Sequence, residues 1–216
     1  MSLYEAKEKH PGYSLKFYNG STLVGTVDSG GIVSIEITRN LIADSPTVGQ
    51  ANAGELDATF IIPSFSIPRM AKVNALVEWN SVTYSLGWFF IDTRSTDPTN
   101  NTLSIVCFDA MLMGEQACGT SGTDITVVNA IATLLGVSVD SSVTSTIVNS
   151  YAIPASMSVD SARDVLKAIG AAYGGSFFIK RDGSLGFAGL VAPAETSYLV
   201  DENGDPITFG GDRIIV

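Results

Sequence analysis

The feature that most constrains the fold of this chain is a series of short segments in which apolar and polar residues alternate. In one of them, Val33, Ile35 and Ile37 alternate with polar residues. A period of two is typical of a β-strand with one buried and one solvated face. The same pattern, bounded by turn signals such as Asn19-Gly20, predicts about seven strands within roughly 100 residues, at 13–18, 22–27, 33–38, 55–61, 73–79, 84–92 and from 103 onward.

A sheet of this many strands has edges that must be covered, and the sequence predicts that it closes on itself. The segment 84–92 is dense in apolar residues, and we expect it to be buried on both faces. Closure into a barrel pairs the edge strands and protects them from aggregation. We therefore predict a closed or nearly closed β-barrel over residues 13–112, preceded by a polar, flexible arm at residues 1–12.

Residues 113–216 show a different pattern, that of helices followed by a hairpin. Helices are predicted over 125–135 and 162–173, because apolar residues recur there at spacings of three and four and a glycine follows each segment. The candidate N-caps are Thr123 or Asp124 for the first helix and Ser158 or Asp160 for the second. Residues 141–150 are predicted to be weakly structured, and 176–187 to form a hairpin. The fold class is thus α+β and mainly β: a barrel followed by a small helix–helix–hairpin domain, or by the start of a truncated second barrel.

The net charge and the spread of basic residues disfavour several classes of partner. Twelve basic and twenty-two acidic residues give a net charge of −10, and lysines and arginines form no cluster. Binding to nucleic acid without sequence preference, or to anionic lipid, needs clustered cations. The sequence also has no apolar run of the roughly 18 residues that a membrane span requires and no signal region at its start, so we expect it to be made and folded in the cytoplasm.

Residues that could carry catalysis are few. His10 is the sole histidine and lies in the predicted arm, where it cannot serve as the rigidly held base of a nucleophilic site. Two carboxylates could act as the acid and base of a glycosidase, but most of those on the strands are expected on solvated faces; the candidates are Glu36, Glu55, Asp57, Glu78 and Asp92. Cys107 is predicted to be a buried thiol, and its spacing from Cys118 fits no metal site or disulfide framework. We predict a non-enzymatic protein with no catalytic, cofactor-binding or metal-binding residues.

Two further patterns have a plain interpretation beside a functional one. Asp201, Asn203 and Asp205 have the oxygen spacing of a small calcium loop. The bidentate glutamate of such a loop is missing, so an ordinary turn is favoured and calcium binding is left open. The strand aromatics are expected in the core, with a carbohydrate-binding platform as the alternative; they are Trp79, Trp88, Phe89 and Phe90.

The order of these features resembles the N-terminal half of tail-tip and baseplate hub proteins of phages and prophages, over about residues 30–190. The motifs that carry the resemblance are structural rather than catalytic. They are Leu86-Gly-Trp-Phe-Phe-Ile-Asp92, Phe108-Asp-Ala-Met111, Arg163-Asp-Val-Leu166 and Asp182-Gly-Ser-Leu-Gly-Phe187.

This resemblance implies a tail-tube-like β-barrel, a homotrimeric ring and a place in the virion tail. Its implied partners are the tail tube or distal tail protein, the tape-measure protein and a tip or fibre protein. Many such hubs are longer than 216 residues, so the chain is either a short hub or a fragment of one. The alternatives are a carbohydrate- or receptor-binding β-module, and another tail component such as a distal tail or tube protein, for which hexamers are expected.

Overall fold

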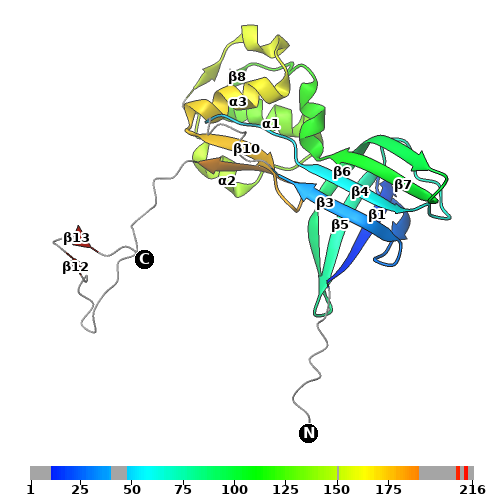
Figure 1. The fold of residues 1–216 in the computed structure, drawn as a ribbon. Coiled ribbons are helices and arrows are strands. Elements are labelled where there is room, and N and C mark those ends of the chain that lie inside the picture. The colour runs from blue at the N-terminus through cyan, green and yellow to red at the C-terminus, as the bar shows by residue number, and fades with distance from the viewer. Residues whose placement is uncertain (1–10, 40–47, 150, 190–207, 210–211, 214–216) are drawn as a thin grey trace.

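The computed structural model describes residues 11–39, 48–149, 151–189, 208–209 and 212–213. Figure 1 shows two parts side by side: a strongly curved sheet, and a smaller group of helices with a two-stranded hairpin. The predicted arm at 1–12 therefore lies almost entirely outside the described residues. The exact boundaries of the two domains stay a prediction.

The first part is one antiparallel sheet with the strand order β2-β1-β5-β6-β7-β4-β3. Each strand that the alternation predicted is present. The strands are β1 (Gly12–Asn19), β2 (Thr22–Val27), β3 (Ile32–Thr38), β4 (Glu55–Ile61), β5 (Lys72–Trp79), β6 (Val82–Asp97) and β7 (Thr102–Phe108). The first turn is displaced by one residue from the prediction, because Asn19 pairs with Thr22 and the turn is Gly20-Ser21.

The sheet curls around a single apolar core formed by its concave face. Phe17 on β1 and Phe60 on β4 are four positions apart in the strand order, which in a flat sheet is about 19 Å. Their ring centroids are 5.6 Å apart. Because the two rings touch, the sheet must fold over onto itself. The same core holds Leu15, Val73 and Phe89, all fully buried.

The prediction of a closed barrel is wrong in one respect, because the sheet does not close among the described residues. Strands β2 and β3 stand at its two ends and do not pair with each other. Phe65, from the segment that follows β4, packs instead on the backbone of β2. A Cβ atom at Gly25 would lie 2.5 Å from the Phe65 ring, so only glycine allows this contact. An aromatic side chain therefore covers the core beside β2, where a barrel would place a paired strand.

The expectation that residues 84–92 are buried on both faces is also wrong. Gly87, Phe89 and Ile91 are buried, whereas Trp88 and Phe90 between them are half-buried and Tyr84 is exposed. Trp88 and Phe90 lie against the second part of the chain, which covers them only in part. Tyr84 pairs with Val77 on the β5–β6 hairpin, beyond the core. Strand β6 is longer than predicted and continues to Asp97.

The second part contains three α-helices, two 3-10 helices and short strands. The elements are η1 (Ala110–Glu115), β8 (Gly122–Thr123), α1 (Asp124–Leu135), α2 (Ser141–Thr146), β9 (Ala152–Ile153), η2 (Ala155–Val159), α3 (Ala162–Ala172), β10 (Gly175–Ile179) and β11 (Leu185–Gly189). A further pair, β12 (Thr208–Phe209) and β13 (Asp212–Arg213), follows. The apolar stripes of α1 and α3 meet β10 and β11 in a second core, which includes Ile131, Leu166 and Phe177.

Local signals placed these helices well, with two exceptions. Thr123 precedes α1, and Gly136 ends it with a left-handed φ of 68°. The cap of α3 is Ser161, whose side chain accepts a hydrogen bond from the Asp164 amide, rather than Ser158 or Asp160. Residues 141–146 form a short helix where we predicted weak structure, because the Asp140 side chain accepts a hydrogen bond from the Ser142 amide and caps it.

Candidate functional site

The carboxylates considered for catalysis lie along the outer side of the sheet. Glu36 on β3 is the cross-strand neighbour of Asp57 on β4. Glu36, Asp57, Glu78 and Asp92 are exposed, and Glu55 is half-buried. Asp92 sits at an irregularity of the β6–β7 pairing. Alternation predicted solvated faces for Glu36, Glu55, Asp57 and Glu78; this is confirmed for the three exposed residues, whereas Glu55 is half-buried.

The aromatic residues divide into three environments rather than sharing a core. Phe89 is fully buried, as predicted. Trp88 and Phe90 are half-buried, and Trp79 is 46% exposed near the end of the β5–β6 hairpin. The core interpretation is therefore correct for Phe89 and wrong for Trp79.

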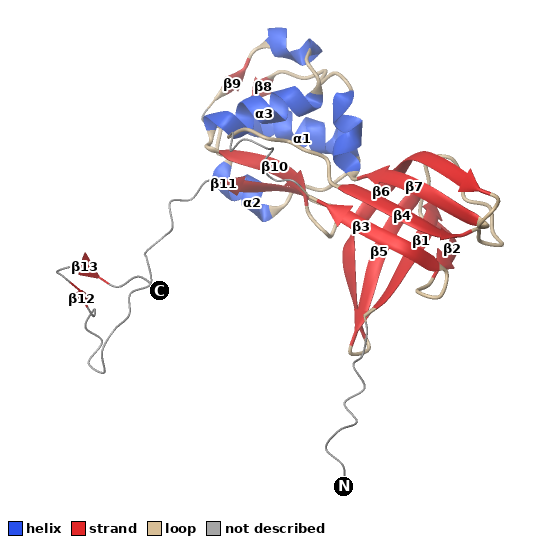
Figure 2. Cartoon of the chain, viewed as in Figure 1, coloured by secondary structure: helices blue, strands red, loops and turns tan. Residues whose placement is uncertain are grey.

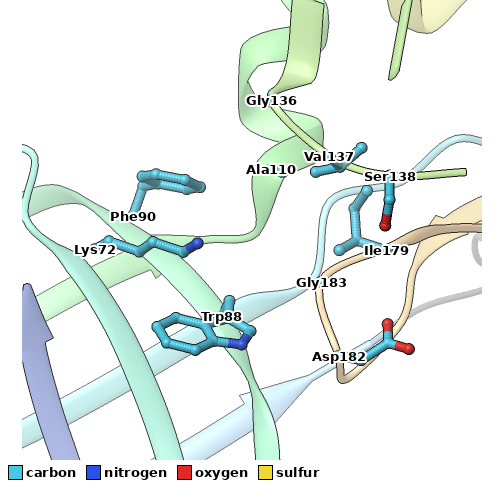
Figure 3. Close-up of a pocket in the computed structure, with 10 residues that line it drawn as sticks. All are labelled: Lys72, Trp88, Phe90, Ala110, Gly136, Val137, Ser138, Ile179, Asp182 and Gly183. Carbon is cyan, nitrogen blue, oxygen red and sulfur yellow. The ribbon is translucent and has the colours of Figure 1, made fainter. Parts of the chain in front are cut away.

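Trp88 and Phe90 line a hollow between the two parts of the molecule (Figure 3). The hollow has a volume of about 220 Å³. Lys72 on β5 places its Nζ 4.4 Å from the Trp88 ring centroid and 6.0 Å from that of Phe90. Such cation–π contacts hold an ammonium group over an aromatic face. The opposite wall is formed by Gly136–Ser138, after α1, and by the turn that joins β10 to β11.

The turn between β10 and β11 carries the one carboxylate of this hollow. Asp182 accepts hydrogen bonds from the Ser184 hydroxyl at 2.6 Å and the Ser184 amide at 2.9 Å, and these bonds lower its pKa. Gly183 lies against Trp88, since a Cβ there would be 3.3 Å from the indole. The Ser85 hydroxyl donates to the carbonyl of Arg181 at 3.4 Å. Because Trp88 is engaged by Lys72 and Gly183, the hollow has the contacts of a packed joint between the two parts.

A second joint is buried and centres on Asp109, at the end of β7. Its carboxylate accepts hydrogen bonds from the Gly54 amide at 2.7 Å and from the Met111 amide at 3.0 Å. Arg39 and Arg163 both favour its charged form electrostatically, as do the two amides. Burial nevertheless outweighs them and raises the pKa of Asp109 to about 6. Asp109 thus ties the loop before β4 to the start of η1.

Arg39 reaches this joint across the end of the sheet. Its guanidinium carbon lies 5.5 Å from the Phe89 ring centroid. A Cβ at Gly87, where φ is 146°, would be 2.0 Å from Arg39 Nη2, so the glycine makes room for the guanidinium. Sequence reasoning missed this arrangement. The available sequence signal was Asp109, which directly follows the predicted buried strand. It stands two residues before Met111, whose amide its side chain can cap.

The remaining candidate residues form no reactive cluster in the part of the chain that the structure describes. Cys107 is buried, as predicted, and burial raises the pKa of its thiol to about 12. Cys118 is also a buried, free thiol. Within the described ranges, no group of three or more His, Cys, Asp or Glu residues could hold a metal ion. The helices in those ranges are too short or too polar to cross a membrane.

Several predicted residues lie outside the described residues. These are His10 and the calcium-loop candidates Asp201, Asn203 and Asp205. Calcium binding therefore stays a prediction with an ordinary turn as its alternative.

Several strands of the sheet have an edge without a strand partner. Among the described residues, β2 pairs only with β1 and β3 only with β4. Strand β6 pairs with β7 only from Phe90 to Asp97, so its first half has a strand partner on one side alone. Unpaired edges expose N–H and C=O groups that favour pairing with another strand. The end strands β2 and β3 and the first half of β6 are therefore open to pairing with another strand.

Comparison with known proteins identifies the fold but no family. Neither the known protein-family models nor the curated proteins include a match. Among solved structures, the 43 kDa tail protein of prophage MuSo2 from Shewanella oneidensis matches 93% of this chain with a TM-score of 0.58 and 13% identity. The prophage tail protein gp18 from Listeria monocytogenes matches 89% of it with a TM-score of 0.46 and 11% identity. The chain spans 61% and 55% of the lengths of these two proteins. It shares its fold with the 43 kDa tail protein.

Proposed function

We propose that this chain is a non-enzymatic structural component of a phage or phage-like tail, located at the tip as a baseplate hub. The observation that carries the proposal is the fold shared with a prophage tail protein over 93% of the chain. The hub assignment within the tail rests on the sequence motifs, which resemble those of hub proteins. The proposed assembly is a homotrimer that joins the tail tube or distal tail protein and the tape-measure protein to a tip or fibre protein.

The free strand edges support an assembling role. Strands β2 and β3 end the sheet with one partner each, and each strand carries an exposed apolar side chain, Leu23 on β2 and Val33 on β3. A ring of copies covers such edges by pairing them between subunits. The low charge of the chain, 16% of its residues, fits the neutral surfaces that protein interfaces prefer.

Native mass spectrometry of the purified chain tests the assembly. Three subunits support the hub, six favour a tube or distal tail protein, and one contradicts self-assembly. Gold-labelled antibody on particles from the producing strain tests the location independently. Label at the distal end of the tail supports the proposal, and particles without label contradict it whatever the subunit count.

A carbohydrate- or receptor-binding module is the second candidate, favoured by one observation. Trp79 and Tyr84 are 46% and 52% exposed on one hairpin, as ring-stacking residues of a sugar platform would be. Glycan-array binding by a monomeric chain, abolished by Trp79→Ala, would favour this candidate over the hub.

A further inference from the structure

The β5–β6 hairpin projects beyond the core and has an apolar face that is largely exposed among the described residues. Figure 2 shows the hairpin extending away from the body of the sheet. Trp79 pairs with Val82, and Val77 pairs with both Tyr84 and Tyr13 of β1. Paired residues, and residues two apart on one strand, share a face of a sheet. These five side chains therefore form one apolar face, which we call the hairpin face; Trp79, Val82 and Tyr84 are each about half exposed.

The outer edge of the same hairpin is also unpaired. Val82–Ser85 pair with β5 on one side, and Leu86 after them is skipped at an irregularity of that pairing. No other backbone hydrogen bond joins Val82–Leu86 to a described residue. Asn80 and Ser81 have φ values of 51° and 64°, the left-handed pair of a two-residue hairpin turn. In such a hairpin, the two residues that flank the turn, here Trp79 and Val82, exchange backbone hydrogen bonds with each other. Every second cross-strand pair beyond them does the same. By this alternation Thr83 directs its N–H and C=O away from β5, toward the open side.

This edge lacks the charged residues and prolines that normally prevent an edge strand from pairing with another chain. Val82–Leu86 contain no charged residue and no proline. An exposed, uncharged edge beside an apolar face accepts an added strand, whose backbone pairs with the edge and whose alternate side chains cover the face.

Among the described residues, two other strands end the seven-stranded sheet with a free edge, β2 and β3, and charge distinguishes them. Strand β3 carries Glu36 and lies beside Glu55 and Asp57 of β4. Strand β2, with the sequence TLVGTV, has no charge and spans six residues against the five of Val82–Leu86. Leu23 of β2 is 50% exposed. An uncharged strand fits an uncharged edge and apolar face without burying a carboxylate, which would be costly.

We propose that the β5–β6 hairpin is the docking site for strand β2 of a second copy of this chain. The contact is heterologous: each copy offers β2 to one neighbour and receives β2 of another at Val82–Leu86. Contacts of this type close into rings when the rotation between copies allows it. The inference rests on the proposed self-assembly and specifies which two strands make it.

Two substitutions test the two sides of this contact separately: one changes the docking edge Val82–Leu86, and the other changes the added strand β2. Thr83→Pro removes an outward N–H and leaves the bonds to β5 in place, which an edge strand tolerates. Leu23→Lys places a charge on β2. The association constant for self-assembly of each variant should fall by roughly tenfold or more, because one side of the strand pair is blocked in every contact. Thr83→Ser, which keeps the N–H, is the control and should associate as the wild type does.

Mixing the two variants gives the decisive result, measured by native mass spectrometry. Thr83→Pro keeps an intact β2 and Leu23→Lys keeps an intact hairpin, so the mixture should form a one-to-one dimer although each variant alone is monomeric. That dimer also shows that both variants are folded.

The other outcomes overturn the inference in recognisable ways. If only Thr83→Pro dissociates the wild-type assembly, the hairpin receives a strand other than β2. If neither variant weakens it, the hairpin carries no contact and self-assembly stands without it. If two dissociating variants fail to combine, the contact is not heterologous. A monomeric wild type would contradict both this inference and the proposed homotrimer.

Discussion

Asp109 gives a quantitative prediction, because burial raises its pKa from 3.8 to about 6 in the folded chain. A carboxyl group with a raised folded pKa is easier to protonate in the folded state than in the unfolded state. Its contribution to stability is therefore fully present below pH 3.8 and is lost as the pH rises through about 6. With these two pKa values, the free energy of unfolding should be higher at pH 4.5 than at pH 7 by about 2 kcal/mol from this group alone.

Asp109→Asn isolates that contribution. The amide cannot ionise, so the variant should lack the rise in stability between pH 7 and 4.5. It also accepts only one of the two amide hydrogen bonds that Asp109 receives from Gly54 and Met111, which costs about 1–3 kcal/mol at every pH. The measurable quantity is thus the difference between wild type and variant as the pH changes, rather than the stability of either.

Urea denaturation followed by tryptophan fluorescence, at several pH values from 4.5 to 7.5, measures this difference. The window stays above the range in which Asp140, Asp164 and Asp182 titrate, because hydrogen bonds lower the pKa of each. Parallel curves for the wild type and the variant would refute the reasoning, since Asp109 would then ionise as freely in the folded chain as in the unfolded one.

Three further predictions concern packing and capping. Phe89→Ala removes a fully buried ring and should lower the free energy of unfolding by about 3–5 kcal/mol in urea denaturation. Gly25→Ala should cost about 1–3 kcal/mol in the same assay, because its Cβ would meet the Phe65 ring at 2.5 Å; an unchanged midpoint would show that the ring moves freely. Ser161→Ala should cost about 1 kcal/mol by removing the cap of α3, whereas Thr123→Ala, whose side chain caps no amide of α1, should cost much less in thermal unfolding.

Local signals account for most of the secondary structure. Alternation located all seven strands of the sheet because it reports directly which side chains face a core. Helix α1 was predicted almost to the residue, since Gly136 provides the left-handed end that a helix stop requires. Where a local signal was overlooked, as with the Asp140 cap of α2, the prediction failed.

The candidate interface was less accessible to sequence reasoning. Trp79 and Phe89 lie on neighbouring strands in similar apolar surroundings, yet one is exposed and the other is buried. The difference depends on how far the opposite wall of the curved sheet extends, which no residue near either of them encodes. The partners of Asp109 come from positions as distant as Gly54 and Arg163, and only the folded chain brings them together.

The sequence by itself determined where strands and helices form, because hydrophobic period, turn residues and caps act over a few neighbouring residues. It also determined that the chain is acidic and sparsely charged. Only the tertiary structure decided that the sheet curls without closing, which edges stay free and that one hairpin extends past the core. These properties depend on pairing between strands far apart in the chain, such as β4 with β7, and on the space that side chains such as Phe65 fill.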